Sequence, residues 1–323
     1  MRRIPGTIAL RVAVLLVIAL LSAACQPGSA STVADDPMPL EPTATVPPTT
    51  TEPELPVPAD GFSGSVKTIA AVGDIGNCDG GNDEKVAAAL VAAKNSLSAI
   101  AILGDIAYVN GSDDDFAKCF APAWNPLKPL LRPAPGNHEY NTPGATGYYK
   151  YFGAAAADPT KGYYSYDIGT WHLIALNSNC TEIGGCEAGS EQEQWLRADL
   201  AASTAKCTIA YWHHPRYSSG LHGSSTSAEA LWNALAAFKA DIVLSGHDHH
   251  YERFAPIDGI RSFVVGTGGA ESYGVLGSIS RSDVVRIFTT GYLKLTLGNG
   301  AYSWQYVPTG GFTYGDSGSA ACR

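Results

Sequence analysis

Short apolar runs recur along the chain, and most of them end at a small residue followed by an acidic or imidazole side chain. Unbroken apolar runs of four or five residues are typical of strands that are buried on both faces. Four such runs predict buried strands, at residues 68–72, 99–103, 208–212 and 241–244. Alternating apolar and polar positions predict three more strands, at residues 163–167, 171–176 and 292–297.

Several segments between these strands are predicted to be helices. Residues 84–94 are rich in alanine and predict one helix. Ser190 and Glu193 have the spacing of a capping box that opens a second helix, and Ser227 is expected to cap a third. The apolar side chains expected on one face are Leu196 and Leu200 in the second helix, and Leu231, Leu235 and Phe238 in the third.

The alternation of strands and helices predicts an α/β fold, in which parallel strands form a sheet and helices pack outside it. In such folds a ligand binds beyond the carboxyl ends of the strands. The ligand-type side chains that follow the apolar runs are therefore expected to meet at one edge.

The first part of the chain has a different composition. Residues 26–61 are rich in Pro and Thr and show no sustained period, which predicts a disordered tether. The rest, 62–323, has the length and apolar content of one large globular domain.

Residues 1–25 read as an export signal. Arg2, Arg3 and Arg11 precede the short apolar segment 12–21, and small residues lead to Cys25. The small residues before Cys25 resemble a bacterial lipobox, although Ser22 stands where an aliphatic residue is usual. We expect a lipid on Cys25 that anchors the protein to a membrane as a cell-surface lipoprotein, with plain secretion as the alternative.

The formal net charge is −9 and the pI is about 5.3. No basic patch is visible, so nucleic-acid binding is not expected. An acidic surface also repels phosphate, so a phosphate site would need its own local positive charge.

Cysteine usage agrees with export. Seven cysteines are present, and six remain if Cys25 carries lipid. An even number in an exported chain favours disulfides, with buried free thiols as the alternative. Cys180 and Cys186 enclose a short Gly-containing loop that closes easily. The pairs Cys78–Cys119 and Cys207–Cys322 are guesses, because six cysteines allow fifteen pairings.

Five short motifs carry the candidate chemistry. Each one alone is common in turns, but five in the strand-end loops of one domain predict a metal site. They are Gly73-Asp74-Ile75-Gly76, Gly104-Asp105-Ile106-Ala107-Tyr108, Gly136-Asn137-His138-Glu139, His213-His214-Pro215 and Gly246-His247-Asp248-His249.

This set, in this order, resembles the calcineurin-like metallophosphoesterase superfamily, and within it the short purple acid phosphatases. The resemblance covers roughly residues 66–253 and implies a sheet-on-sheet core flanked by helices, an αββα sandwich. The usual superfamily Asp-x-His start is absent, because Gly76 occupies the His position. The purple acid phosphatase pattern supplies Tyr108 instead.

The resemblance implies two metal ions bridged by Asp105. One ion would bind Asp74, Tyr108 and His249, and the other would bind Asn137, His213 and His247. His213 is preferred to His214 because the family pattern is His-x-Pro.

Two further histidines are implied as catalytic residues. His138 would lie near the phosphate and the leaving group. His222 stands nine residues after His213, as a further active-site histidine does in mammalian-type members, although an exposed loop histidine is the alternative. Tyr251, Glu252 and Arg253 follow the last motif and are read as structural or as supports for the ligands.

A Tyr108 phenolate would be a hard anionic donor that favours Fe³⁺, with Fe²⁺, Zn²⁺ or Mn²⁺ as the second ion. The expected function is the hydrolysis of small phosphate monoesters by direct attack of a metal-bound hydroxide. One alternative is a phosphodiesterase that acts on nucleotides or glycerophosphodiesters. The other is a non-catalytic cell-surface binding module.

Overall fold

The computed structural model describes residues 57, 61–78 and 82–323. The predicted signal segment, Cys25 and nearly all of the predicted tether lie outside the described residues. Within the described part of the chain, no helix combines the length and apolar character that a membrane crossing requires.

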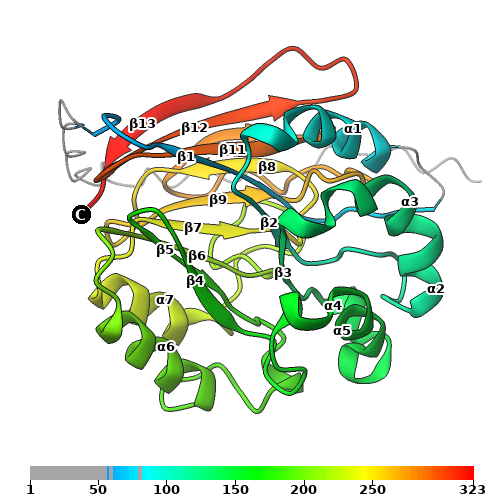
Figure 1. Ribbon diagram of the computed structural model, residues 1–323, viewed down its shortest axis with the longest axis horizontal. Helices are drawn as coiled ribbons and strands as arrows, with labels where there is room; N and C mark the ends of the chain where they lie inside the picture. The colour runs from blue at the N-terminus through cyan, green and yellow to red at the C-terminus, as the bar shows by residue number, and fades with distance from the viewer. Residues whose placement is uncertain (1–56, 58–60, 79–81) are drawn as a thin grey trace, which may run out of the picture. The chain divides into compact units, whose positions relative to one another are not determined.

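Two sheets form the centre of the described region (Figure 1). The first has the order β13-β12-β11-β1-β2-β3, and its β1, β2 and β3 are parallel. Its strands are β1 (Lys67–Val72), β2 (Ala99–Leu103), β3 (Leu131–Ala134), β11 (Gly291–Leu297), β12 (Ala301–Pro308) and β13 (Ser317–Ala321).

The second sheet has the order β10-β8-β9-β7-β6-β5-β4. Its central strands β5, β6, β7 and β9 are parallel, and antiparallel strands flank them. The strands are β4 (Tyr164–Ile168), β5 (Trp171–Ala175), β6 (Cys207–Tyr211), β7 (Ile242–Ser245), β8 (Tyr251–Phe254), β9 (Arg261–Val265) and β10 (Ser282–Arg286).

Helices cover the outer face of each sheet (Figure 1). Those of the first sheet are α1 (Asp83–Ala93), α2 (Asp113–Asp115), α3 (Ala121–Trp124), α4 (Asn137–Tyr140) and α5 (Thr146–Phe152), with a π-helical turn at Phe116–Phe120. The second sheet is covered by α6 (Glu191–Ala202) and α7 (Glu229–Ala237). Short 3₁₀ turns lie at Lys94–Ser96, Asn125–Leu130, Pro143–Ala145, Gly153–Ala156 and Cys180–Glu182.

Alternate residues of each central strand face different apolar cores. In β1, Ile69 packs between the sheets, whereas Ala70 packs under the helices of the first sheet. In β6, Ile209 packs between the sheets and Ala210 faces α6 and α7. This two-residue period on strands buried on both faces produces a helix–sheet–sheet–helix arrangement. The predicted αββα sandwich is therefore confirmed.

The predicted helix starts had different outcomes. Ser190 caps α6, where its Oγ accepts a hydrogen bond from the Glu193 amide at 3.4 Å. The prediction that Ser227 caps α7 is wrong, because that helix begins after Ala228 without a side-chain cap. The Ser227 hydroxyl instead contacts Ser225 Oγ at 2.6 Å. Phe238 follows the last turn and is 39% exposed, so it does not extend the apolar stripe.

All three predicted disulfides are present. They are Cys78–Cys119, Cys180–Cys186 and Cys207–Cys322. Cys207 begins β6 in the second sheet and Cys322 follows β13 in the first, so the third disulfide joins the two sheets. Asp241 lies beside that pair, but cysteines in a disulfide are not available as thiolate ligands for a metal.

Candidate metal centre

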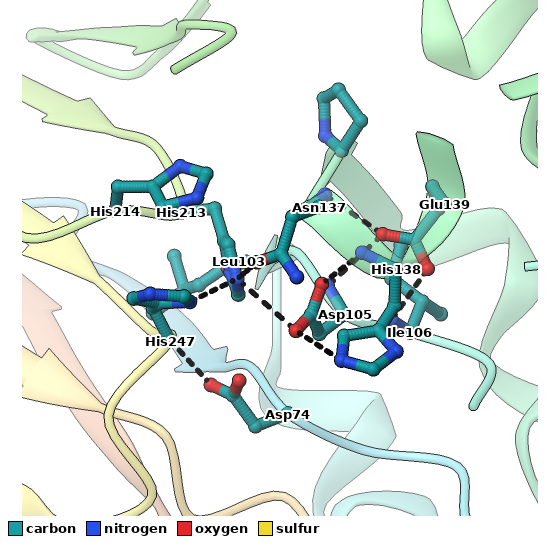
Figure 2. A network of polar contacts seen from close by, with 12 residues as sticks. Asp74, Leu103, Asp105, Ile106, Asn137, His138, Glu139, His213, His214 and His247 are labelled. Atoms are coloured by element: carbon teal, nitrogen blue, oxygen red, sulfur yellow. Dashed lines mark hydrogen bonds and ion pairs between the residues drawn. The ribbon is translucent and has the colours of Figure 1, made fainter. Parts of the chain in front are cut away.

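The five motifs converge at the carboxyl ends of strands from both sheets (Figure 2). Asp74, Asp105 and Asn137 follow β1, β2 and β3 of the first sheet. His213 follows β6 of the second sheet, and His247 and His249 follow β7. The expectation that these side chains meet at one edge is met, and the candidate centre lies between the two sheets.

The backbone at three of these positions is left-handed. The φ angles are +59° at Asp74, +48° at Asp105 and +71° at His247. Residues other than glycine adopt this region at a cost of about 1–3 kcal/mol, and such residues cluster at functional sites. The surrounding contacts therefore stabilise a costly backbone that points these side chains at one another.

Glycines in the motifs make room for the carboxylates. A Cβ on Gly136 would lie 2.1 Å from Asp105 Oδ1, and one on Gly246 would lie 2.5 Å from Asp74 Oδ2. Both distances are far below van der Waals contact. Gly136 and Gly246 are therefore each required by the close approach of a carboxylate from a different loop.

One half of the cluster surrounds the Tyr108 hydroxyl. This oxygen lies 3.2 Å from Asp74 Oδ1, 3.2 Å from Asp105 Oδ2 and 3.1 Å from His249 Nε2. His249 Nδ1 faces the backbone oxygen of Glu271 at 2.6 Å. In the neutral ring Nδ1 must therefore carry the proton, so the Nε2 lone pair points into the cluster.

The other half surrounds His213. Its Nε2 lies 3.0 Å from Asn137 Oδ1 and 3.2 Å from His247 Nδ1. Its Nδ1 lies 2.8 Å from the backbone oxygen of Leu103, which orients the ring in the same way as that of His249.

Asp105 is common to both halves. Its Oδ2 lies 3.2 Å from the Tyr108 hydroxyl and also 3.2 Å from His213 Nε2. The structure thus brings together all seven residues predicted as metal ligands: Asp74, Asp105, Tyr108, Asn137, His213, His247 and His249.

The donor set fits cations better than protons. A phenol donates one hydrogen bond, yet the Tyr108 oxygen has two carboxylates and an imidazole nitrogen around it. Ligand atoms of Asp74, Asp105 and His213 all lie within 4.8 Å of one another, as do those of His213, His214 and His247. Buried oxygen and imidazole donors at this density match the requirements of a divalent or trivalent metal site.

Two groups of the cluster have raised pKa values. Burial alone would lower the pKa of His213, but the Asp105 carboxylate raises that pKa to about 9. Burial and the Asp105 and Asp74 charges raise the pKa of Tyr108 well above its ordinary value. A cation must displace these protons, so metal binding is expected to release protons and to weaken as the pH falls.

The two predicted catalytic histidines lie at the rim. His138 Nδ1 faces the backbone oxygen of Val109 at 2.6 Å, and its Nε2 lies 3.8 Å from Asp105 Oδ2. The His222 ring is exposed and its centroid lies 4.3 Å from that of His247. The His222 amide donates to Asp248 Oδ1 at 3.0 Å, which holds the loop against the cluster.

Sequence reasoning assigned no role to the carboxylate of Glu139. It is fully buried and accepts hydrogen bonds from the amides of Asp105 at 3.0 Å, Ile106 at 2.8 Å and Gly136 at 2.7 Å. Burial and the Asp105 charge raise the pKa of Glu139 to about 7. Glu139 thereby joins the loop after β2 to the loop after β3 and orients the shared Asp105.

Replacing Glu139 by Gln should weaken metal binding at the candidate centre. Glutamine offers one acceptor oxygen, and its NH₂ group would face an amide donor, so at least one of the backbone hydrogen bonds is lost. We expect metal affinity to fall by about 10–100-fold, as for other groups that orient ligands. Competition with a chelator would measure this affinity. Lys150→Gln, on the exposed surface, is the control, and equal affinities for Glu139→Gln and wild type would contradict the role.

Two other carboxylates shape the loop that carries His222. Sequence reasoning assigned no role to Asp248, and it read Glu252 as structural or as a support for the ligands. Asp248 accepts from the Ser218 hydroxyl at 2.5 Å, and Glu252 accepts from the Ser219 amide at 2.9 Å. A structural role was predicted for Tyr251 and Arg253, and both hydrogen-bond to Asp316 beside β13.

The comparisons with known proteins agree with this geometry. The family model for calcineurin-like phosphoesterases matches residues 67–251. Purple acid phosphatase 15 of Arabidopsis thaliana is 28% identical over 222 residues, which cover 57% of this chain and 40% of the relative. The chain therefore spans less than half the length of this relative.

Solved structures with the same fold include two phosphatases. The yellow lupin purple acid phosphatase PPD1 superposes with a TM-score of 0.70 at 20% identity, over 82% of this chain and 55% of that one. A dimetal phosphatase from Danio rerio superposes with a TM-score of 0.56 at 13% identity, over 80% of this chain and 99% of that one. With the family match over more than half of the chain, the predicted resemblance is confirmed: the chain belongs to the calcineurin-like phosphoesterase family and is similar to its purple acid phosphatases.

Proposed function

We propose that the protein is an exported, metal-dependent phosphoesterase that hydrolyses phosphate monoesters. The observation that carries this proposal is the pair of ligand groups that share Asp105 Oδ2, at 3.2 Å from Tyr108 in one group and from His213 in the other. A shared carboxylate oxygen between two donor sets is the arrangement expected of a dinuclear site.

In this proposal each group of residues holds one cation. Asp74, Tyr108 and His249 would hold the first, Asn137, His213 and His247 would hold the second, and Asp105 would be shared. Two bound cations would lower the pKa of water and offset the negative charge of the phosphate. The hard Tyr108 oxygen favours Fe³⁺ in the first position, and Fe²⁺, Zn²⁺ or Mn²⁺ suits the second.

The remaining residues manage the proton. Water gives up one proton as its oxygen forms a bond to phosphorus, the bond from phosphorus to the ester oxygen breaks, and that oxygen takes up a proton. His138 Nε2 and the exposed ring of His222 are the candidates to supply it. The Val109 carbonyl keeps the proton of the neutral His138 ring on Nδ1, so Nε2 is the nitrogen that gains and loses a proton.

The three disulfides support export, because such bonds persist in oxidising compartments. We propose a signal segment over residues 1–25 with lipid on Cys25, a tether over 26–61 and a phosphoesterase domain over 62–323. The lipid would hold the domain at the cell surface, where its substrates are small phosphorylated molecules.

Metal analysis combined with two substrates tests the proposal. The purified, secreted protein is expected to contain two metal ions per chain and to hydrolyse phenyl phosphate faster than diphenyl phosphate. A chelator should abolish hydrolysis and added metal should restore it. A faster rate on the diester would favour the phosphodiesterase instead. Protein that stays inactive and metal-free after reconstitution would contradict enzyme function and favour a binding module.

A further inference from the structure

A cavity of about 380 Å³ adjoins the candidate metal centre on the side of Asn137 and His214. This volume lies within the range of small-molecule binding sites. The other groups that line it are mainly hydroxyls and amides, from Tyr140, Asn141, Ser178, Asn179, Thr181 and Ser227. We call this space the Asn179 cavity.

The wall of the Asn179 cavity is held in place by specific contacts. The Cys180–Cys186 disulfide closes the loop that follows β5. Asn179 Nδ2 donates to the backbone oxygen of Pro135 at 3.1 Å, directly before the motif that carries Asn137. Ser178 Oγ lies 2.8 Å from His214 Nδ1. The cavity is therefore preformed and fixed relative to the metal centre, which lowers the cost of ordering it around a ligand.

The side chains that line the Asn179 cavity carry negative charge without a matching positive charge. Glu182 is the one carboxylate that lines it, and none of the described residues that line it is Lys or Arg. Hydroxyl and amide groups can pair with the hydroxyls of a neutral ligand. A ligand carrying a second anionic group would meet Glu182 without a compensating cation.

We propose that the Asn179 cavity receives the leaving group of the substrate and selects neutral, hydroxyl-rich leaving groups, such as sugars, over anionic ones. Glu182 is the residue that disfavours the anionic group. This inference rests on the proposed phosphoesterase function, because the phosphate must sit at the metal centre for the leaving group to reach the cavity.

A matched pair of substrates tests the selection. Glucose 6-phosphate releases a neutral sugar, whereas 6-phosphogluconate releases a sugar acid of almost the same size. We expect kcat/KM to be at least about fivefold higher for glucose 6-phosphate, mainly through a lower KM. In Glu182→Lys this ratio should fall to about one, with Glu182→Gln in between. Glu182 is exposed, so these changes should leave folding intact.

Glu187→Lys is the matched control. Glu187 lies just outside the same disulfide loop, is exposed and does not line the cavity, and its replacement changes the net charge equally. The substrate ratio of Glu187→Lys should stay within about twofold of wild type. Equal use of both sugar phosphates by the wild type, or an equal shift in both Lys variants, would overturn the inference.

Phenyl phosphate separates the two levels of the argument. If the metal-loaded protein hydrolyses phenyl phosphate but does not distinguish the two sugar phosphates, only the selection by the Asn179 cavity is wrong. If it hydrolyses no phosphate ester, the proposed function is wrong and the inference falls with it.

Discussion

Asp105→Asn should reduce phosphate ester hydrolysis by roughly a thousandfold or more. Asp105 is buried, and its Oδ2 contacts Tyr108 in one ligand group and His213 in the other. Asparagine has nearly the same shape but carries no negative charge and offers one acceptor oxygen instead of two. Both proposed ions would lose charge neutralisation at once, so metal content is expected to fall together with kcat.

Asp113→Asn is the control for Asp105→Asn, since Asp113 is an acidic side chain at the surface, paired with Lys150. It should retain wild-type metal content and rates. Because His213 owes its raised pKa to Asp105, the Asp105→Asn protein should also show a lower His213 pKa by NMR in the metal-free state. Unchanged hydrolysis in Asp105→Asn would exclude Asp105 as a shared ligand.

Tyr108→Phe should remove any visible absorption of the iron-loaded protein. The Tyr108 oxygen lies within 3.2 Å of Asp74, Asp105 and His249, so it is placed to bind the same ion as these residues. Phenylalanine keeps the ring but removes the anionic oxygen that favours Fe³⁺. We expect the affinity for Fe³⁺ to fall by at least about 100-fold, and the affinity for divalent ions to fall by less.

Tyr273→Phe is the matched control for colour. The Tyr273 ring packs against His249 with centroids 4.7 Å apart, but its hydroxyl donates to the backbone oxygen of His247 at 2.9 Å. Its loss should leave the spectrum unchanged. If absorption persists in Tyr108→Phe, or disappears equally in Tyr273→Phe, Tyr108 is not a ligand.

The buried strands could be predicted because their apolar runs are uninterrupted, as at β2 and β7. The strands that were not predicted lack such a pattern. β3 contains Pro133 and lies at a sheet edge, where a missing amide is tolerated. β13 consists of Ser, Gly and Ala, which carry little strand signal. The second sheet was expected only from the family resemblance, because runs buried on both faces do not show which face meets a sheet and which meets a helix.

The candidate ligands could be predicted because four of the five motifs couple a glycine to an Asp, Asn or His, and the fifth places two histidines before Pro215. No role was assigned to the buried carboxylates of Glu139 and Asp248, although they fix the loops. An acid in a loop looks the same in the sequence whether it faces solvent or accepts backbone hydrogen bonds. The spacing of Gly136 and Glu139, typical of the first turn of a helix, was the available signal for one of them.

The candidate ligands come from two separate sheets: Asp74, Asp105 and Asn137 from one, and His213, His247 and His249 from the other. Cations bound between them would hold one layer of the fold to the other, in addition to the covalent link from Cys207 to Cys322. Occupancy of the centre and resistance to heat are then thermodynamically linked. Removal of the proposed cations would then end turnover and also shorten the lifetime of the folded protein.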